Sequence, residues 1–294
     1  MEKVTVKVPA TSANLGPGFD CVGIALSMYD TVTFEKRKSG LTIEGCPAKY
    51  RNKNNLAALA YNKTAEYMKA PTCGLYINIR TNIPVARGLG SSAALIVAGA
   101  VAANALNGGK LTKEELLSVC TEIEGHPDNL APAIFGGLTA SFMDGKTPYT
   151  VEYDIAPCWH FTAVIPNFPL STKNARAVLP DKIPFRDAVF NISRTAVLLK
   201  AFEQGNAEIL NKTMHDRLHQ PYRASLIEEY DTVETIARDL GASGFYLSGA
   251  GPTLMCVSKE QDFSEKLGLA LREKCKSDWL AVGLPIAHGG AELV

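Results

Sequence analysis

The chain has 294 residues, of which 46% are hydrophobic and 20% are charged, so it is long enough for one large or two ordinary globular domains. Thirty basic residues balance thirty acidic ones, which gives no electrostatic reason to expect a nucleic acid or an anionic membrane as a partner. The seven cysteines are scattered, without a C-x-x-C pair, and MEKVTVKVPATS at the N-terminus has no apolar signal core. We therefore expect reduced thiols and a cytoplasmic protein with no membrane attachment.

The first strand is expected at residues 4–8, where valines alternate with polar residues. The stretch ATSANLGPGFD, residues 10–20, then packs small and polar residues into a turn. Its Asn14 and Asp20 either support the turn through side-chain hydrogen bonds to the backbone or contact a ligand. Composition alone leaves both interpretations open.

Two short strands within residues 31–44 and a helix over residues 56–69 come next. Asn54 or Asn55 is expected to cap that helix at its N-terminus. GLYINIR, residues 74–80, alternates as a strand and leads directly into a glycine-rich loop.

That loop and the helix after it, PVARGLGSSAALIVAGAVAA at residues 84–103, organise the chain. Gly88 and Gly90 permit a tight turn with backbone N–H groups close to a ligand. The helix expected to start at Ser91 has first N–H groups without internal partners, at the positive end of its dipole. A strand, a glycine loop and a helix in this order are typical of a phosphate-binding site. The alternative interpretation is a structural turn before a core helix.

Two other nucleotide-binding patterns fit less well. The dinucleotide pattern G-x-G-x-x-[GA] matches at Gly88, Gly90 and Ala93, but it is weak alone and lacks a convincing strand–glycine–helix unit near the start of the chain. The Walker pattern fails, because Ala140 stands where the first glycine before residues 145–147, Gly-Lys-Thr, should be.

Polar side chains are concentrated after a helix expected near residues 113–123. Five of them fall within eight positions, namely Glu122, Glu124, His126, Asp128 and Asn129. A carboxylate here could hold Mg²⁺ on the phosphates of a nucleotide, because Mg²⁺ prefers oxygen ligands. The alternative is a solvated helix end in which Asp128 caps the apolar helix NLAPAIF.

The second half alternates strands and helices without a regular one-to-one coupling, which predicts α+β layers. Strands are expected near residues 161–166, 244–247, 253–258 and 279–285, and helices over 185–204, 206–214, 222–240 and 262–275. The polar segment 143–157, which contains Gly and Pro, indicates a boundary between domains over residues 1–150 and 151–294.

Three features of the second half could contact a ligand. Thr172 and Arg176 are four residues apart and would share one face of a helix. Arg223 could bind a carboxylate through its planar guanidinium, or lie on the surface. The glycines within residues 241–257 lie beside strand residues, which indicates a close backbone approach to a ligand or to another loop.

His215 and His219 have the i, i+4 spacing of helical zinc sites. However, Asp216 stands between them instead of the glutamate that a zinc protease uses as its base, and no third ligand is evident. An exposed helical face is therefore the favoured interpretation.

Several of these stretches resemble one family. PVARGLGSSAA at 84–94, ATSANLGPGFD at 10–20 and LSGAGPT at 247–253 are similar to the three signature motifs of the GHMP small-molecule kinases, in their usual order across nearly the whole chain. Within that superfamily, ATSANLGPGFD together with EGHPDNLAPAIFGG, LSTKNARAVLP and HQPYR resembles the homoserine kinases most closely.

The resemblance implies a two-domain α+β GHMP kinase fold, with a nucleotide-binding domain over residues 1–150 and a ferredoxin-like domain over 151–294. It implies ATP-dependent phosphorylation of the side-chain hydroxyl of L-homoserine to O-phospho-L-homoserine in threonine biosynthesis, with Mg²⁺ as cofactor and a homodimer as the common assembly. The alternatives are a GHMP kinase that acts on another small alcohol, and a member of the fold that binds a ligand without turnover. A sugar has neither the carboxylate nor the ammonium group that Asp20 and two arginines would recognise.

Carried over by position, the family motifs imply four groups of residues. The ATP-binding group is Asn55, Pro84, Arg87, Gly88, Leu89, Gly90, Ser91, Ser92, Ala93 and Ala94. The substrate-binding group is Asn14, Asp20, His126, Thr172, Arg176 and Arg223. Ser92 and Glu122 would hold the metal, with Glu124 as the alternative acid. Asn129 lies near the reacting hydroxyl, and Asp128 is the candidate base if the loose transition state of phosphoryl transfer needs one.

Overall fold

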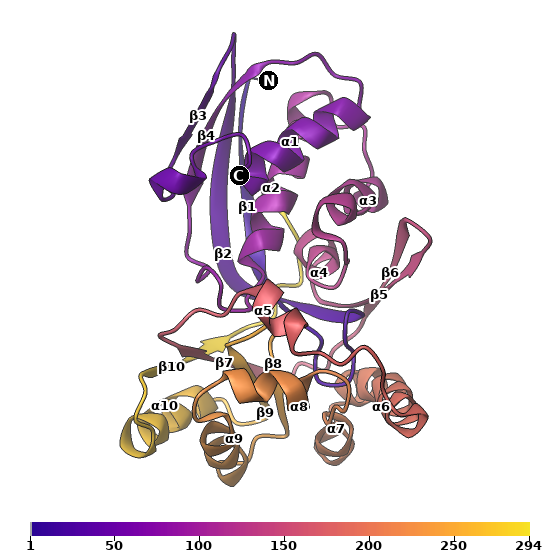
Figure 1. The fold of residues 1–294 in the computed structure, drawn as a ribbon, viewed down its shortest axis with the longest axis vertical. Coiled ribbons are helices and arrows are strands. Elements are labelled where there is room, and N and C mark those ends of the chain that lie inside the picture. Colours follow the sequence, from indigo (N-terminus) through magenta and orange to yellow (C-terminus); the bar gives the residue numbers. More distant parts are fainter. Residues whose placement is uncertain (1) are drawn as a thin grey trace.

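The computed structural model describes residues 2–294, whose strands fall into two sheets stacked along the long axis of the molecule (Figure 1). The upper sheet has seven strands and the lower sheet has four. The upper strands are β1 (Lys3–Ala13), β2 (Val22–Arg37), β3 (Leu41–Glu44), β4 (Gly74–Arg80), β5 (Leu138–Asp144), β6 (Thr147–Tyr153) and β11 (Glu292–Leu293). The lower strands are β7 (His160–Pro166), β8 (Gly244–Leu247), β9 (Leu254–Ser258) and β10 (Trp279–Leu284).

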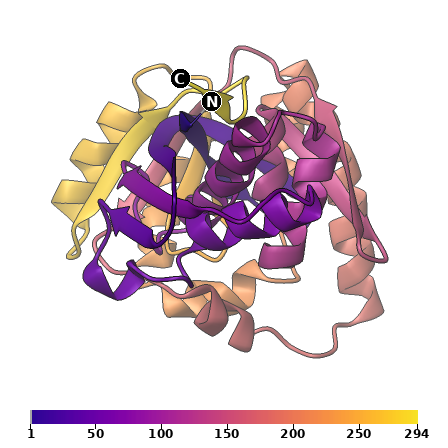
Figure 2. The same cartoon turned by 90° about the horizontal axis from the view of Figure 1, so that it is seen from above.

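The upper sheet has the order β11-β1-β2-β4-β3, and β2 is long enough to pair with β1 along one edge and with both β5 and β4 along the other. Its first residues, Val22–Ile24, pair with β5, whereas its second half pairs with β4. β6 pairs with β5 as a hairpin. β11 pairs with β1 near the end marked C in Figure 2, with Val6 opposite Leu293. The upper sheet is therefore built from both ends of the sequence.

Four helices cover one face of the upper sheet (Figure 1). They are α1 (Leu56–Tyr67), α2 (Ser91–Leu106), α3 (Lys113–Glu124) and α4 (Leu130–Phe135), and a short 3₁₀ helix, η1 (Ala48–Tyr50), precedes α1. α2 is the central helix because small residues let its neighbours approach closely: Gly99 meets the backbone of Ala57 in α1, and a Cβ there would collide with the Ala57 carbonyl oxygen. The predicted helix start at Ser91 is confirmed.

The lower sheet has the order β10-β7-β9-β8, and its helices lie mostly on the side away from the upper sheet (Figure 1). Its helical elements are α5 (Thr172–Ala177), α6 (Phe185–Gln204), α7 (Ala207–Thr213), α8 (Gln220–Arg223), η2 (Ala224–Leu226), α9 (Tyr230–Asp239) and α10 (Phe263–Lys274). The single helix expected over residues 222–240 is wrong, because the chain breaks between η2 and α9, where Glu229 has a positive φ of 60°.

Two features lie across the expected domain division after residue 150. That position falls inside β6, which continues to Tyr153 before the chain leaves the upper sheet. Further on, the segment after β10 returns to the upper half, where Ser27 N–H donates to the Pro285 carbonyl and Ala291 N–H donates to the Ala133 carbonyl. The two expected domains, residues 1–150 and 151–294, are therefore joined by backbone hydrogen bonds as well as by a linker.

Candidate active site

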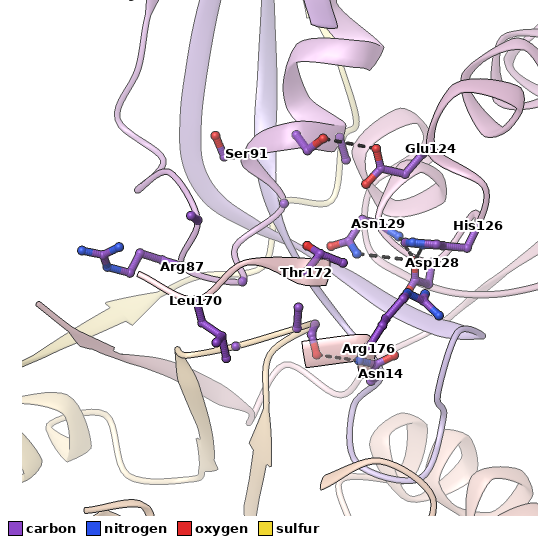
Figure 3. Close-up of a pocket in the computed structure, with 18 of the residues that line it drawn as sticks. Asn14, Arg87, Ser91, Glu124, His126, Asp128, Asn129, Leu170, Thr172 and Arg176 are labelled. Atoms are coloured by element: carbon purple, nitrogen blue, oxygen red, sulfur yellow. Dashed lines mark hydrogen bonds and ion pairs between the residues drawn. The ribbon is translucent and has the colours of Figure 1, made fainter. Parts of the chain in front are cut away.

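A cleft opens where the two sheets meet (Figure 3). Six segments of the chain contribute to it: the turn after β1, the loop before α2 with the start of that helix, the link between α3 and α4, the segment that carries α5, the end of α8, and the loop between β8 and β9. The lining residues are Asn14, Asp20, Ala86, Arg87, Gly88, Gly90, Ser91, Ser92, Ala93, Glu124, His126, Asp128, Asn129, Leu170, Thr172, Arg176, Arg223, Gly249, Ala250 and Gly251.

The glycine-rich loop forms the upper wall of the cleft at the N-terminus of α2. Gly88 and Gly90 have φ values of 78° and 71°, which favour glycine. A Cβ at Gly88 would collide with the Ser248 carbonyl, and one at Gly90 with the hydroxyl of Thr11. Both positions therefore combine a left-handed backbone with a close approach. The loop presents the first turn of α2 to the cleft, an arrangement that suits a phosphate.

The loop between β8 and β9 supports the glycine-rich loop from below. Ser248 Oγ donates to the Gly88 carbonyl at 2.6 Å, and Thr253 N–H donates to the Arg87 carbonyl at 3.2 Å. Ser12 Oγ lies 2.7 Å from Ser248 Oγ, so the end of β1 joins the same contact. The close backbone approach expected from the glycines of residues 241–257 is confirmed, and it is an approach to another loop.

Glu124 is the carboxylate that faces the start of α2. Ser92 Oγ donates to Glu124 Oε2 at 3.2 Å (Figure 3). Glu122 instead pairs with Lys63 of α1 at 2.8 Å and is 53% exposed, outside the cleft. Residues two apart on a helix do not share a face, so Glu122 and Glu124 cannot both reach Ser92. Of the two acids considered for the metal, the structure therefore brings the alternative, Glu124, and not the preferred Glu122, into contact with Ser92.

Asp20 and Arg176 form a two-pronged ion pair at the opposite end of the cleft. Arg176 Nη2 donates to Asp20 Oδ1 at 2.8 Å, and Nη1 donates to Asp20 Oδ2 at 3.1 Å. Asn14 accepts a hydrogen bond from Asp20 N–H on Oδ1 and donates through Nδ2 to the Gly249 carbonyl. Asn14 thus supports the turn, as one interpretation held, and the same turn holds the Asp20 carboxylate in the cleft.

Arg223 is a buried cation at the floor of this end, which excludes the surface position considered from the sequence. It is 2% exposed, and its guanidinium donates to the carbonyls of Ala175 and Gly249, each at 3.0 Å. Burial lowers the pKa of Arg223 to about 10, and the nearby charge of Arg176 acts in the same direction. The side chain still carries its charge at neutral pH and suits an anion such as a carboxylate.

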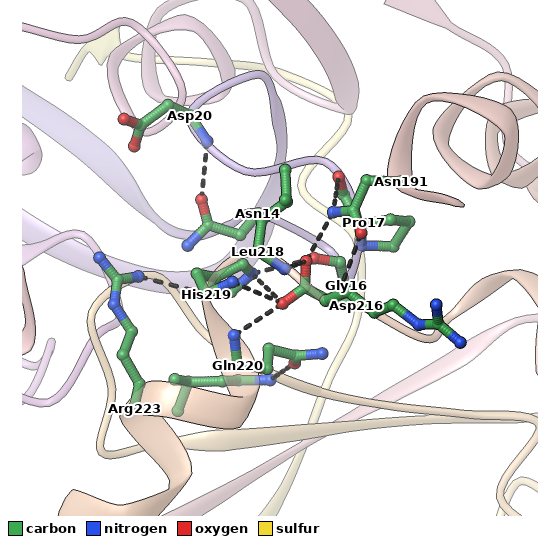
Figure 4. A network of polar contacts seen from close by, with 12 residues as sticks. Asn14, Gly16, Pro17, Asp20, Asn191, Asp216, Leu218, His219, Gln220 and Arg223 are labelled. Carbon is green, nitrogen blue, oxygen red and sulfur yellow. Dashed lines mark hydrogen bonds and ion pairs between the residues drawn. The ribbon is translucent and has the colours of Figure 1, made fainter. Parts of the chain in front are cut away.

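A polar network fixes Arg223 from behind (Figure 4). His219 is fully buried, and its Nε2 donates to the Gly16 carbonyl at 2.9 Å. The Asp216 carboxylate accepts from the N–H groups of residues 218–220 and from Asn191 Nδ2. Burial lowers the pKa of His219, which keeps its imidazole neutral. The expected exposed helical face is therefore wrong for His219, because Asp216 organises this stretch as a buried turn.

A chain of hydrogen bonds runs along the back of the cleft through Asp128. His126 Nδ1 lies 2.6 Å from Asp128 Oδ1, which also accepts from Asn129 N–H at 3.0 Å. Asn129 Oδ1 in turn accepts from Thr11 Oγ1 at 2.8 Å. Burial disfavours the charged imidazole of His126, but the hydrogen bond and charge of Asp128 and the charge of Asp20 outweigh it and raise the His126 pKa. The ionisable atoms of Asp20, His126 and Asp128 lie within 4.8 Å of one another at this end of the cleft.

Four of the expected ATP-binding residues lie outside the cleft lining. Asn55 caps α1 by accepting from Ala57 N–H, which confirms one of the two expected caps, and Leu89 and Ala94 are buried beneath the loop. Pro84 also lies outside. Arg87 lines the cleft, but its guanidinium points away from it (Figure 3) and donates to the carbonyls of residues 166 and 167.

Thr11 and Leu170 are two residues of this region that the sequence did not single out. Leu170 lines the cleft, and Thr11 joins two of its walls, because its N–H donates to the Leu89 carbonyl while its hydroxyl donates to Asn129. A threonine in a strand and a leucine in a loop are too common to be noticed alone. The position of Thr11 inside the ATSANLGPGFD motif was the available signal.

The chain matches two family models. A model described as the N terminal domain of GHMP kinases matches residues 55–137, and one described as the C terminal part of GHMP kinases matches residues 198–277. With the glycine loop at a helix N-terminus and a carboxylate beside it, these matches define a small-molecule kinase, and the chain belongs to the GHMP kinase family. The expected two-domain α+β GHMP kinase fold is confirmed.

Within that family the chain groups with the homoserine kinases. It is 45% identical over 278 residues to the homoserine kinase of Clostridium botulinum (strain ATCC 19397 / Type A), a match that covers 94% of this chain and 93% of the relative. The homoserine kinase of Clostridium beijerinckii is 42% identical over 294 residues, covering 99% and 98%. The crystal structure of homoserine kinase from Cytophaga hutchinsonii superposes with a TM-score of 0.90 at 27% identity, covering 100% of this chain and 98% of that one.

None of the helices within residues 2–294 combines the length and the apolar character needed to cross a membrane.

Proposed function

We propose that this protein transfers the γ-phosphoryl group of ATP to the side-chain hydroxyl of L-homoserine, giving O-phospho-L-homoserine on the way to threonine. The observation that carries the proposal is the charge distribution of the cleft. A phosphate-binding helix N-terminus lies at one end, and an aspartate with two arginines lies at the other. The relatives named homoserine kinase at 42–45% identity support the same substrate.

The charged end of the cleft suits an α-amino acid. The substrate ammonium would contact Asp20, and the carboxylate would contact Arg176 and Arg223. A sugar would leave the buried Arg223, which contacts only backbone carbonyls and His219, without an anionic partner, at a cost in desolvation that disfavours it. This charge pattern is why L-homoserine is preferred over another small alcohol.

The phosphate end suits a nucleotide with a divalent cation. Ser92 and Glu124 offer only oxygen atoms, 3.2 Å apart, which fits a hard cation such as Mg²⁺. We propose these two residues as its protein ligands, and Gly88, Gly90, Ser91 and Ala93 as the phosphate cradle. Bound with ATP, the metal would neutralise charge that develops on the transferred group.

The remaining residues would position the reacting hydroxyl. Asn129 lies between the two ends, held on one side by Thr11 and on the other by Asp128. We propose that the Asn129 amide orients the hydroxyl for in-line attack, and that no side chain is indispensable as a base, because the transition state of phosphoryl transfer is loose. Asp128 then acts by holding Asn129 and His126.

Replacing Thr11 by valine should lower kcat about tenfold, because the isosteric change leaves Asn129 Oδ1 without its donor and frees the amide to rotate. The KM for ATP should change little. Steady-state kinetics of Thr11→Val and Thr11→Ser would measure this, and the serine variant, which keeps the hydroxyl, should recover most of the activity. Equal losses in both variants would mean that Thr11 acts through packing alone.

The reaction can be tested with a coupled ADP-release assay containing Mg-ATP and a panel of L-homoserine, L-serine, mevalonate and galactose. Turnover confined to L-homoserine, and strongly reduced in Arg176→Ala, is the expected result. Turnover of another alcohol would support the kinase activity but contradict L-homoserine as the substrate. ATP binding without turnover of any alcohol in the panel would favour a ligand-binding role.

The cellular location and the oligomeric state belong to the same proposal. We propose a cytoplasmic enzyme, supported by seven cysteines that all remain free thiols. We also propose a homodimer, as the resemblance implies. The exposed aromatic pair Phe142 and Tyr149 on the β5–β6 hairpin supports this, because it offers apolar surface for a second copy.

A further inference from the structure

Three buried hydroxyl groups lie in a row beneath the glycine-rich loop. Tyr246 Oη on β8 is 3.0 Å from Ser12 Oγ on β1, and Ser12 Oγ is 2.7 Å from Ser248 Oγ. Ser248 Oγ in turn donates to the Gly88 carbonyl at 2.6 Å. Tyr246, Ser12 and Ser248 are each 0% exposed. The row therefore joins the lower sheet and the upper sheet to one carbonyl of the loop.

The donors and acceptors in this row have only one arrangement. A hydroxyl has a single proton, and a carbonyl oxygen can only accept. Because Ser248 gives its proton to Gly88, it must accept from Ser12. Ser12 has then used its own proton and must accept from Tyr246. Burial raises the pKa of Tyr246, so this phenol keeps its proton at neutral pH.

The carbonyl at the end of this chain is held differently from its neighbours in the loop. The carbonyls of residues 86, 87 and 89 accept from the backbone N–H groups of Leu170, Thr253 and Thr11, respectively. The Gly88 carbonyl instead accepts from a side chain. In a trans peptide the C=O and N–H groups point in opposite directions, so the bond to Ser248 also fixes where the Leu89 N–H points. That N–H has no hydrogen-bond partner within residues 2–294.

We propose that Tyr246, Ser12 and Ser248 are positioning residues for the nucleotide, because their hydrogen-bond chain fixes the orientation of the Gly88–Leu89 peptide in the phosphate loop. The inference rests on the proposed function and adds to it three residues that do not line the cleft. Without the Ser248 hydroxyl this peptide can rotate, since Gly88 has no side chain to restrict it. Each bond in such a chain polarises the next, so a change at Tyr246 is transmitted to the Gly88 carbonyl.

The chain should affect the nucleotide and not the second substrate. Ser248→Ala should weaken binding of Mg-ADP about fivefold, the usual contribution of one hydrogen bond. Tyr246→Phe keeps the aromatic ring, removes the outermost donor and should weaken binding about threefold. The KM for L-homoserine should change little in either variant, because the chain ends on the phosphate loop.

A double variant separates positioning from packing. If Tyr246 acts on the loop through Ser248, adding Tyr246→Phe to Ser248→Ala should leave the loss of Mg-ADP affinity at about fivefold. Two independent effects would multiply to about fifteenfold. The measurement is calorimetric titration of the full chain with Mg-ADP, for the unaltered protein, the two single variants and the double variant.

Ser258→Ala is the matched control. It also removes a fully buried serine hydroxyl, but this one accepts from Glu260 N–H at 2.9 Å at the end of β9, outside the cleft lining. Its affinity for Mg-ADP should equal that of the unaltered chain. A loss in Ser258→Ala as large as that in Ser248→Ala would assign the effect to a general loosening of the lower sheet and reject the chain as its cause.

The other outcomes also decide the question. Unchanged affinity in Tyr246→Phe, multiplied losses in the double variant, or no binding of Mg-ADP to the unaltered chain would each contradict the inference. If Ser248→Ala does not fold, the ratio of the KM for ATP to the KM for L-homoserine decides it, because Tyr246→Phe should raise that ratio about threefold. Equal rises in both KM values would indicate packing alone. Failure of the unaltered chain to phosphorylate L-homoserine would reject the proposed function, while the Mg-ADP titrations would still test the chain.

Discussion

Replacing Glu124 by glutamine is expected to lower kcat on the order of 100-fold, because a lost carboxylate ligand weakens a metal that supplies several kcal/mol to transition-state stabilisation. Glu124 is bonded to Ser92 at the start of α2, where the phosphates are proposed to lie. Glutamine keeps the size of the side chain and removes its charge. The measurement is kcat as a function of Mg²⁺ concentration, and the variant should also need more Mg²⁺ for half-maximal rate.

Glu122→Gln is the matched control for that experiment. Glu122 is two residues away, carries the same charge and pairs with Lys63 at the exposed side of α3. Its replacement removes an exposed ion pair, which contributes at most about 1 kcal/mol to stability and does not contact the cleft. A loss of kcat in Glu122→Gln as large as that in Glu124→Gln would reject Glu124 as the metal ligand.

The second large effect is expected at Arg223. Replacing it by lysine should raise the KM for L-homoserine on the order of 100-fold, because truncating one member of a buried charge contact costs about 2–5 kcal/mol. Lysine retains a charge but cannot bond two carbonyls and a carboxylate in one plane. The KM for ATP should change far less, and the ratio of the two KM values is the quantity to measure.

Arg217→Lys provides the comparison for Arg223. Arg217 is nearby in sequence, is 48% exposed and pairs with Asp187 outside the cleft lining. Its replacement should leave both KM values near those of the unaltered protein. If Arg223→Lys raised the KM for ATP as much as that for L-homoserine, the arginine would serve the architecture of the whole cleft and not the carboxylate.

The parts of the fold that depend on local sequence could be predicted. The alternating valines gave the position of β1, and the glycine loop followed by an apolar run gave the start of α2 at Ser91. These features follow from side-chain periodicity and from backbone angles that only glycine adopts easily. The convergence of three distant motifs followed from the family resemblance.

The parts that depend on long-range partners could not be predicted. The choice between Glu122 and Glu124 depended on Lys63, a residue of another helix. The buried turn around His219 depends on Asn191 of α6, whose side-chain amide donates a hydrogen bond to the Asp216 carboxylate. The two histidines have the i, i+4 spacing of a helix in the sequence, but residues 215–219 lie between α7 and α8 and are not helical, because tertiary hydrogen bonds override the local pattern.

The return of the chain to β1 has a consequence for biosynthesis. Residues 292 and 293 pair with the first strand, and Lys7 forms an ion pair with Glu292 at 2.9 Å. A ribosome must therefore release nearly three hundred residues before this edge of the upper sheet can close, whereas the other strands of that sheet, β1 to β6, are complete by Tyr153. During synthesis the edge of β1 stays open, and we expect nascent chains to depend on chaperones at that strand.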